Sequence, residues 1–489
     1  MAAADAFNPA HPDLPNGAGA PARLAAEHYA EALARVVYIW GHPLVNTFGR
    51  TSTWTLMEGH GPGMAMGLFP GSPKNRMGYI DDYMPAAQRK VVTPNNDTIY
   101  GACFADLGEE PVVVQTPPDV PKGHYWTIQI VDAFTTVIHQ LGSASETPGG
   151  KYLLVGPEWR GEKPEGFAGV LRSPTNIAVA MARSFTAHSP ESKAQARAVL
   201  NQMGVSPLSE DKPGLRQFDC EASARNKVYP EGLSAEALAA DPDLLRARPV
   251  HGERFWDDLE RALDANPVVG PGDAPMAAQA RALLELRKSD TAWRLLLDRA
   301  VLAADAELFE GARYEQVGVQ VGNGWQRQEN GGRWGADWLG RAQAAAIYIY
   351  VNDFEEAVYF IRGTDADGAL LQGRYRYRMR FEKDQLPPVD RSRGGFWSLT
   401  MYDKDYYMVP APNGRHNIGT VNLDADELKF AEDGSLTLVL SSQEPIDEME
   451  RANWLPAPAD QFALIVRSYV PTAPILDGGY KLPQVERLR

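Results

Sequence analysis

The sequence predicts an α+β protein that is mainly β, in which a helical insert separates two jelly-roll-like antiparallel β-sandwich domains. Two observations support this fold class. Short apolar runs between turn residues occupy 91–180 and return near the C-terminus, whereas 189–309 shows the three- and four-residue apolar spacing of helices. The chain also contains 44 glycines and 37 prolines among 489 residues, an excess that favours turns and short strands.

Four segments follow from these patterns. Residues 1–20 carry few bulky apolar side chains to offset the entropy of ordering, so we predict a flexible tail there. Residues 21–185 form an N-terminal helix plus a β-sandwich domain. The helical insert and a Gly/Trp-rich loop occupy 186–344, and a second β-sandwich domain occupies 345–489.

The first helix is predicted over 22–40, where apolar residues recur at helical spacing until the Gly-His-Pro sequence at 41–43 interrupts them. A loop rich in Gly, Pro and Met follows at 57–73. Ser189 is a candidate N-cap for the first helix of the insert, because proline follows it in the first turn. Further helices are predicted at 234–247, 253–264, 275–288 and 290–309.

After the Gly/Trp-rich loop at 322–340, the pattern returns to strands. We predict them in the sequences AAAIYIYV, EAVYFIRG, GRYRYRMRF, GGFWSLTMYD, SLTLVLS and FALIVRSYV.

An internal repeat relates the two β regions. GHYWTIQIVD at 123–132 aligns without gaps with GGFWSLTMYD at 394–403. Further along, KYLLV precedes FAGVLRS at 167–173, and SLTLVL precedes FALIVRS at 462–468. Matched blocks in the same order indicate duplicated or convergently similar β domains.

Period-two geometry assigns faces to the aligned strands, and we predict that one face is core and the other wetter. The predicted core face carries Trp126, Ile128, Ile130 and Asp132 in the first copy and Trp397, Leu399, Met401 and Asp403 in the second. The opposite face carries Tyr125, Thr127 and Gln129, and then Phe396, Ser398, Thr400 and Tyr402.

Charge and cysteine content narrow the class of partners. The chain has 48 basic and 63 acidic side chains, a net charge of −15 that disfavours nucleic acid and anionic membranes. Cys103 and Cys220 allow one disulfide at most, and we find neither a signal-like N-terminus nor an apolar run long enough to span a bilayer. We therefore expect a cytoplasmic protein with a small-molecule substrate, and leave open a homo-oligomer.

Several segments resemble two bacterial families. TPNNDTIYGACFADL at 93–107, GHYWTIQIVDAFTTV, YLLVGPEW and VLRSPTNIAV resemble the domain of unknown function numbered 1254. EEAVYFIRG, RYRYRMRF, QLPPVD, FWSLTMYDKDYYMVPAPNGRHNIG, NWLPAP and KLPQVERLR resemble its usual C-terminal partner, numbered 1214. The resemblance implies two largely β, jelly-roll-like domains and no settled reaction. Many members carry an export signal, which this N-terminus does not show, and His416 stands where the second family has an aromatic residue.

Asp97 and Tyr100 are candidate catalytic groups, because a carboxylate and a phenol can exchange protons with a substrate. On a regular strand beginning at Asp97 they would point to opposite faces. The alternative is an Asx-type turn that leads into the strand.

Asp132 and Asp403 end equivalent strands, and Arg172 and Arg467 end the segments aligned above. A carboxylate and a guanidinium in each copy could bind a polar substrate or tune the pKa of the acid. Structural ion pairs or turn aspartates would use the same residues, and duplication favours that alternative.

Aromatic and basic residues gather at two further places. Tyr402, Arg415 and His416 could orient an oxygen-rich substrate, or form a loop of half-buried side chains. Trp325 and Trp334 suit stacking against a ring, or packing between domains.

Metal and cofactor signals are weak. His60 lies near three methionines, which are more typical of a mobile loop than of a metal site, and His124 and His139 lack the spacing of cupin ligands. The chain contains no P-loop, GxGxxG, GxSxG or HExxH motif, so we expect neither a metal nor a cofactor.

Together these features predict an enzyme that acts on a small oxygen-rich or ring-containing molecule, by carboxylate acid/base catalysis in a pocket between the β domains. A hydrolase or lyase fits best, with Asp97, Asp132 and Tyr100 as catalytic candidates. Two alternatives stay open. One is a non-catalytic carbohydrate or small-ligand binding protein, and the other is a metal-dependent oxygenase.

Overall fold

The computed structural model describes most of the chain, and the statements below concern that part. The described residues are 19–54, 64–66, 69–86, 88–89, 91–228, 235–241, 250–268, 270, 272–314 and 318–488. The predicted tail lies outside the described residues except for its last two residues, which begin the first helix. His60 and about half of the predicted loop at 57–73 also lie outside them.

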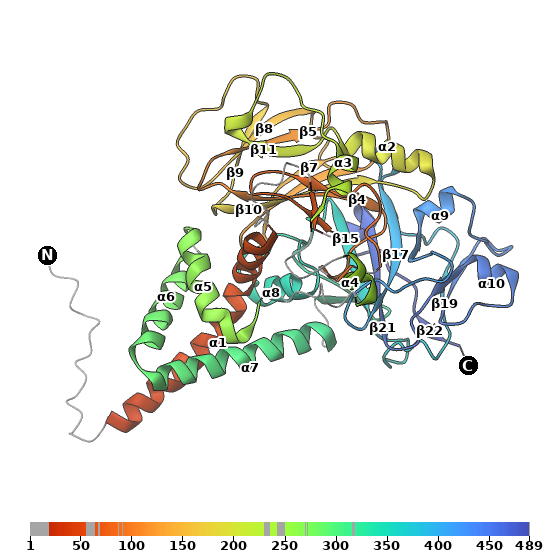
Figure 1. The fold of residues 1–489 in the computed structure, drawn as a ribbon. Helices are drawn as coiled ribbons and strands as arrows, with labels where there is room; N and C mark the ends of the chain where they lie inside the picture. The colour runs from red at the N-terminus through yellow and green to blue at the C-terminus, as the bar shows by residue number, and fades with distance from the viewer. Residues whose placement is uncertain are drawn as a thin grey trace.

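Five helices form a layered arm beside the β domains (Figure 1). They are α1 (Gly19–Trp54), α5 (Phe255–Ala265), α6 (Ala274–Ser289), α7 (Thr291–Tyr314) and α8 (Trp338–Ile347). Their common core contains Trp40, Phe255, Leu297 and Ala342, all fully buried. None of the described helices is both long and apolar enough to cross a membrane.

Helix α1 is longer than the sequence predicts. It continues through Pro43 to Trp54, so the expected end at residue 40 is wrong. A proline inside a helix removes one backbone hydrogen bond, but residues 40–47 are buried against the arm, and this packing overrides the local signal. Gly41 permits close contact, since a Cβ there would lie 3.0 Å from Leu259 Cδ1 on α5.

The first β domain is built from two sheets. The inner sheet has the order β3-β4-β10-β6-β7, and the outer sheet has the order β11-β5-β8-β9. The strands are β3 (Gly78–Tyr79), β4 (Thr98–Asp106), β5 (Val112–Thr116), β6 (Trp126–Asp132), β7 (Val137–Gly142), β8 (Gly150–Val155), β9 (Gly169–Arg172), β10 (Ile177–Phe185) and β11 (Gly204–Pro207).

The C-terminal β domain repeats this order. Its inner sheet is β13-β14-β15-β21-β17-β18 and its outer sheet is β20-β19-β16-β22. The strands are β13 (Val319–Gly322), β14 (Trp325–Arg327), β15 (Ala357–Arg362), β16 (Tyr377–Phe381), β17 (Phe396–Asp403), β18 (Asn417–Gly419), β19 (Leu436–Ser441), β20 (Trp454–Pro456), β21 (Phe462–Tyr469) and β22 (Glu486–Arg487). Strands β4 to β11 therefore correspond one by one to β15 to β22.

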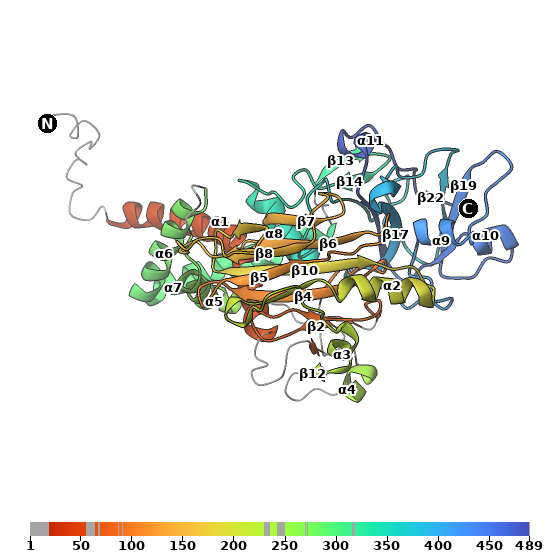
Figure 2. The ribbon, with the colours of Figure 1, turned by 90° about the horizontal axis from the view of Figure 1, so that it is seen from above.

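Shorter elements connect these layers. They are β1 (Met64–Met66), β2 (Phe69–Gly71), β12 (Lys227–Val228), α2 (Pro190–Leu200), α3 (Cys220–Arg225), α4 (Ala235–Ala240), α9 (Thr420–Asp424), α10 (Glu448–Ala452) and α11 (Ala473–Leu476). Ser189 caps α2 as predicted, because its hydroxyl accepts a hydrogen bond from the backbone N–H of Ser192. Viewed from above, the helical arm and the C-terminal domain lie on opposite sides of the first sandwich (Figure 2).

The strand order confirms the repeat at 123–132 and 394–403, which are β6 and β17 with the turns before them, but corrects its second block. FAGVLRS contains the edge strand β9, whereas FALIVRS is the central strand β21. The true counterpart of β21 is β10, so Arg467 corresponds to Arg183 and not to Arg172. The two segments share a few letters although their strands occupy different places in the sheets.

Several segment boundaries also differ from the sequence prediction. The first half of AAAIYIYV, residues 344–347, belongs to α8, and no part of the segment is a strand. Strand β11 adds to the first sandwich beyond residue 185, and β13 and β14 join the second sandwich before residue 345. Helix content is about 31% and strand content about 26%, so the fold is mixed α+β and not mainly β.

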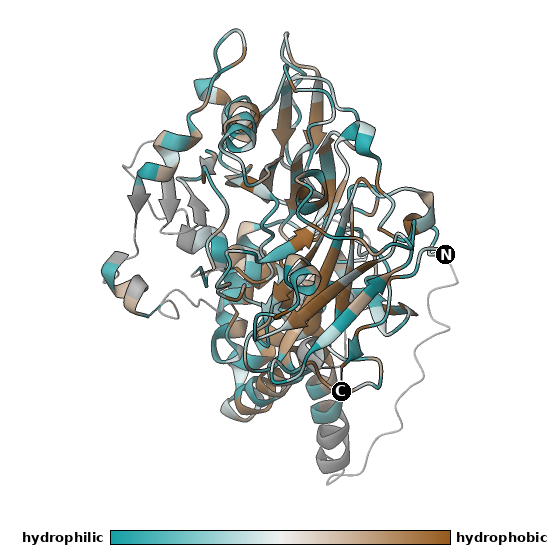
Figure 3. Ribbon diagram, turned by 90° about the vertical axis from the view of Figure 1, so that its right-hand side faces the viewer, coloured by the Kyte–Doolittle hydropathy of each residue, from teal (hydrophilic) through white to brown (hydrophobic). Residues whose placement is uncertain are grey.

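Each sandwich has its own apolar core, visible as brown strands in Figure 3. Ile128 from the inner sheet meets Val114 and Leu154 from the outer sheet, and Leu399 occupies the corresponding place in the second core. The predicted core faces are therefore correct. The faces expected to be wetter are instead buried where the two inner sheets meet, since Thr127, Gln129, Ser398 and Thr400 are at most 1% exposed.

Replacing Gly41 by leucine tests the packing of α1 on α5. We expect a loss of about 1–3 kcal/mol in the free energy of unfolding, because the new side chain would overpack against Leu259 and Phe255. Urea unfolding measures this change in the free energy of unfolding, provided that the m-values of the variant and the wild type are equal. Val36→Leu on the same helix is the matched control, since Val36 is 40% exposed and its replacement should change little. Equal stability of both variants would contradict this account of Gly41.

Candidate functional site

A cavity of about 70 Å³ lies where the two inner sheets meet. One water molecule needs roughly 10–15 Å³, so the cavity has room for about five water-sized groups. Its wall combines side chains of β4, β10, β15 and β21 with the segments at 91–95 and 348–351. The residues that line it are Met84, Val91, Val92, Thr93, Pro94, Asn95, Tyr100, Met181, Arg183, Gln328, Tyr348, Ile349, Tyr350, Val351, Tyr359, Ile361, Ile465, Arg467 and Tyr469.

Arg183 reaches this cavity from the central strand β10. Its guanidinium donates to Gln129 Oε1 at 3.0 Å and to Asn352 Oδ1 at 3.3 Å, and it lies over the ring of Tyr100. The side chain is 6% exposed. Strand pairing places Arg183 directly opposite Tyr100 on β4.

Arg467 repeats this arrangement from the second domain. Its guanidinium donates to Thr400 Oγ1 at 3.2 Å and to the carbonyl oxygen of Thr93 at 2.7 Å. It lies over the rings of Tyr359 and Tyr402, and Tyr359 is its pairing partner on β15. The side chain is 3% exposed.

Both guanidiniums are charged and buried, and within the described residues neither forms an ion pair with a carboxylate. All four of their hydrogen bonds go to neutral oxygens. A guanidinium has five N–H groups, and two on each of Arg183 and Arg467 donate in these hydrogen bonds. Burial of a charge without an ion-pair partner is unfavourable, so the two guanidiniums favour negative charge in the cavity.

Gln328 and Tyr350 contribute further polar groups to the wall. The amide of Gln328 is 3% exposed, and neither its Oε1 nor its Nε2 forms a hydrogen bond to a described residue. The hydroxyl of Tyr350, which is 5% exposed, interacts with the side chain of Thr47, so the unsatisfied polar atoms of the wall are those of Gln328. Buried polar groups in native proteins are almost always satisfied, so these atoms indicate bound water or a bound ligand.

The phenols around the cavity are neutral at physiological pH. Burial raises the pKa of Tyr350 to about 12, and it raises the pKa of Tyr348, Tyr359 and Tyr469 as well. A neutral phenol can donate a hydrogen bond. Together with the arginines, these residues surround the cavity with donors.

Asp97 lies one layer behind the cavity wall. Its carboxyl group is 1% exposed and accepts hydrogen bonds from Ser398 Oγ at 2.6 Å and Asn417 Nδ2 at 2.7 Å, both in the other domain. Burial raises its pKa to about 6, while these two hydrogen bonds and the charge of Arg467 act in the opposite direction. Strand β4 begins after Asp97, and the Asx-type turn that leads into it is made by Asn95, whose Oδ1 accepts from the backbone N–H groups of Asp97 and Thr98.

Glu356 is the counterpart of Asp97 in the second domain. It directly precedes β15 and accepts a hydrogen bond from the hydroxyl of Tyr125 in the first domain. Burial raises its pKa to about 7, against the opposing effects of hydrogen bonds with Tyr125 and Thr127 and of the charge of Arg183.

Asp132 lies away from the cavity wall and stabilises a turn. Its Oδ1 accepts from the backbone N–H groups of Phe134 and Thr136, both at 2.9 Å. Asp403 accepts from the N–H groups two and four residues later at the same distances. The duplicated aspartates Asp132 and Asp403 are thus turn residues, which is the structural alternative to a substrate-binding role given above.

The predicted substrate-binding residues are not brought together around the cavity. Arg172 is exposed and lies over the ring of Trp159. Trp325 is fully buried and donates to the Pro483 carbonyl, while Trp334 donates to the Thr135 carbonyl, so both tryptophans are packing residues and not a stacking platform.

The residues around His416 also form hydrogen bonds within the protein and do not line the cavity. Arg415 donates to the carbonyl oxygen of Ala452, and His416 Nδ1 contacts the carbonyl oxygen of Val409. Tyr402 lies closer to the site, because its hydroxyl donates to the Pro94 carbonyl at 2.6 Å and its ring faces Arg467. Of the predicted site residues, Tyr100 lines the cavity, and Asp97 and Tyr402 lie just behind its wall.

Sequence reasoning missed Arg183, Glu356 and Gln328. Two short signals could have identified the first two. Alignment of ARSF at 182–185 with VRSY at 466–469 equates the two arginines, and alignment of DTIY at 97–100 with EAVY at 356–359 equates the two acids. Gln328 carries no such signal. Within the described ranges, no three His, Cys, Asp or Glu side chains are grouped as a metal site would require.

Two family models match the chain. The model described as "Protein of unknown function (DUF1254)" matches 74–207, and the model described as "Protein of unknown function (DUF1214)" matches 356–473. The first match runs through β11 and the second from Glu356 into α11, so each match covers most of one sandwich. No curated protein matches the chain.

Solved structures also resemble the chain. The crystal structure of the VPA0106 protein from Vibrio parahaemolyticus has a TM-score of 0.61 and 21% identity, and the match covers 94% of this chain and 100% of that one. A putative uncharacterized protein from Burkholderia cenocepacia matches with a TM-score of 0.44 and 11% identity over 95% of this chain and 96% of that one. The first similarity shows that the fold extends over nearly the whole chain.

The raised pKa values of Asp97 and Glu356 predict a specific pH dependence of stability. A carboxyl group whose folded pKa exceeds its unfolded pKa stabilises the fold below the unfolded value, and this contribution is lost as the pH rises through the folded value. We therefore expect the Asp97→Asn/Glu356→Gln variant to match the wild type near pH 4 and to be more stable at pH 8. The upper limit is roughly 3 kcal/mol for each group.

Thermal melting of both proteins between pH 4 and pH 8 measures this difference. Groups common to both proteins cancel in the comparison. A difference in melting temperature that does not change with pH would show that these two carboxyl groups do not titrate in this range.

Proposed function

This chain belongs to the proteins that pair a DUF1254 domain with a DUF1214 domain, and we propose that it is an enzyme acting on a small oxygen-rich or ring-containing molecule in the cavity between the two. The observation that carries the proposal is a buried polar group on the cavity wall that lacks an internal partner. The Gln328 amide supplies donors and an acceptor to a space with room for about five water-sized groups.

The chemistry proposed is that of a hydrolase or lyase. Both reaction types place negative charge on a substrate oxygen in the transition state, and fixed donors in a site shielded from water stabilise such charge. Neutral phenols and guanidiniums are donors of this kind. Tyr100 is the proposed proton donor in contact with the substrate, because it lines the cavity and keeps its ring against Arg183.

Asp97 has a different part in this proposal. It lies behind the wall and acts through Arg467, whose charge influences its pKa. A carboxyl group with a pKa of about 6 changes charge close to neutral pH, so its ionisation would alter the electrostatic potential in the cavity. We therefore assign Asp97 as a positioning residue, and we withdraw Asp132 because of its place in a turn.

One observation favours the rival function, a non-catalytic small-ligand binding protein. Neither a carboxylate nor a histidine is among the described residues that line the cavity, and a site that only binds its ligand needs no such catalytic group.

The jelly-roll-like character of the sandwiches stays a prediction, since each outer sheet also contains a parallel strand pair. A cytoplasmic location, a homo-oligomer and the metal-dependent oxygenase alternative stay predictions as well.

Turnover by the Tyr100→Phe variant tests the enzyme proposal. The substrates are p-nitrophenyl acetate, followed by p-nitrophenolate absorbance, and small 2-hydroxy acids, followed by the absorbance of the alkene formed on dehydration. We expect the wild type to turn over at least one of them, and Tyr100→Phe to lower kcat at least tenfold without a change in melting temperature. Tyr152→Phe is the matched control, because that hydroxyl contacts the Pro148 carbonyl outside the cavity.

Binding of these compounds by the wild type without any turnover would overturn the enzyme proposal in favour of the passive binder. Full activity of Tyr100→Phe would remove Tyr100 from the mechanism.

The Asp97→Asn variant tests the positioning role on the same substrates. We expect a lower kcat and the loss of the limb of the pH–rate profile near pH 6, because the group that titrates there is absent. A residue that is merely structural would lower the melting temperature and leave the shape of the profile unchanged. An unchanged pH profile in a folded variant would therefore contradict the assignment.

A further inference from the structure

We propose that the cavity binds a small organic carboxylate, whose charged group lies between Arg183 and Arg467 and whose apolar body contacts the aliphatic wall. This inference names the class of ligand, and it rests on the proposed function for the location of the site. The chain as a whole has a net charge of −15, so a positive cavity is a local property of these residues.

The first argument is the state of the two arginines. Each is more than nine-tenths buried, lines the same cavity and directs its hydrogen bonds to neutral oxygens. In the described part of the chain no carboxylate forms an ion pair with either. Two buried positive charges beside one small space are stabilised when an anion occupies that space.

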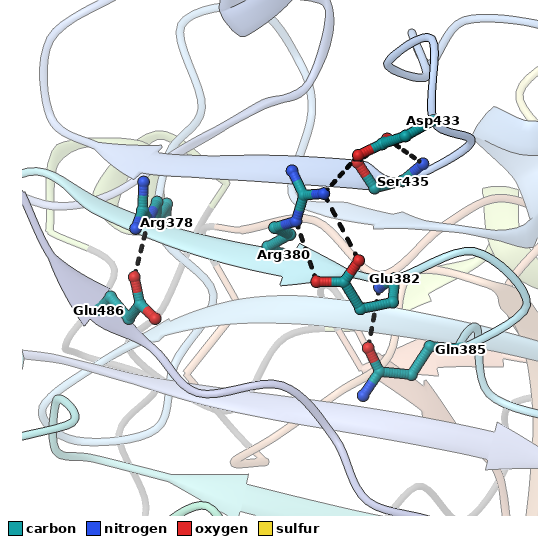
Figure 4. A network of polar contacts seen from close by, with 7 residues as sticks. All are labelled: Arg378, Arg380, Glu382, Gln385, Asp433, Ser435 and Glu486. Carbon is teal, nitrogen blue, oxygen red and sulfur yellow. Dashed lines mark hydrogen bonds and ion pairs between the residues drawn. The ribbon is translucent and has the colours of Figure 1, made fainter.

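Exposed arginines of this chain provide a contrast. On the outer face of β16, Arg378 pairs with Glu486 at 2.7 Å, and Arg380 contacts both Glu382 and Asp433 (Figure 4). Such surface pairs contribute little to stability. The surface of this strand thus supplies carboxylates to arginines that water also solvates, whereas no carboxylate in the described part of the chain forms an ion pair with either buried arginine.

Asp97 and Glu356 are the internal acids on which the charges of Arg467 and Arg183 act, but within the described residues neither acid forms an ion pair with a guanidinium. Asp97 instead accepts hydrogen bonds from Ser398 and Asn417, and Glu356 accepts one from Tyr125. Burial also raises the pKa of both groups, to about 6 and about 7, and so disfavours their charged forms. A ligand carboxylate in the cavity would contact the guanidiniums directly, which neither acid does.

The rest of the wall selects the class of anion. The planar fork of a guanidinium matches a carboxylate in two-point hydrogen bonding. Met84, Val91, Met181, Ile361 and Ile465 provide an apolar surface beside it. A phosphate ion would leave that surface without contacts, whereas a carboxylate with a short apolar body would contact both parts of the cavity.

Calorimetric titration of the full chain with benzoate and butyrate, and with the neutral amides benzamide and butyramide, tests the inference. We expect at least one carboxylate to bind at least tenfold more tightly than its amide, and Arg183→Gln and Arg467→Gln each to weaken that binding at least tenfold. Arg378→Gln removes an exposed arginine and should leave it unchanged. Circular dichroism and thermal melting establish that each variant folds.

If a variant does not fold, the comparison of acid with amide in the wild type still decides the question. Equal binding of acid and amide, no binding of either carboxylate, or tighter binding of inorganic phosphate than of both carboxylates would each overturn the inference. Carboxylate binding without turnover of any substrate would uphold the inference and refute the enzyme proposal. Turnover of a neutral ester without carboxylate binding would uphold the enzyme proposal and overturn the inference.

Discussion

Buried hydrogen bonds between the two sandwiches are the constraint on which the rest of the structure depends. Asp97 of the first domain accepts from Ser398 and Asn417 of the second, and Glu356 of the second accepts from Tyr125 of the first. Separation of the inner sheets would leave these groups without their partners and would also expose a large apolar surface. The domains are therefore held in one relative position, and the cavity between them has fixed walls.

The same contact explains why polar residues occur on the inner face of each inner sheet. A sheet that faced water would need such residues for solubility, but here they form hydrogen bonds across the interface, as Gln129 does with the carbonyl oxygen of Val351. Gln328, whose amide forms no hydrogen bond to a described residue, lies on the cavity wall. A buried polar group without an internal partner is expected where water or a ligand binds.

Much of the fold could be predicted from the sequence, because periodicity reports which face of an element is buried. The longer strands of both sandwiches, the faces of β6 and β17 and the cap at Ser189 followed from local patterns, whereas the short strands β11, β13 and β14 lie in the segment predicted as insert and loop. Helix α1 did not, since packing of residues 40–47 overrides Pro43. Of the site, Tyr100 and the region of Asp97 were predicted, whereas Arg183 was not, because a short chance similarity aligned Arg467 with the edge strand instead of with β10.

The equivalence of β4–β11 and β15–β22 makes the contact between the sandwiches isologous in form, as in a homodimer whose subunits are joined in one chain. In a true homodimer every substitution in the shared site occurs twice. In this chain Asp97 and Glu356, or Gln129 and Thr400, occupy corresponding positions with different side chains. Covalent fusion has thus released the site from symmetry, so that an asymmetric molecule can be held in a single orientation.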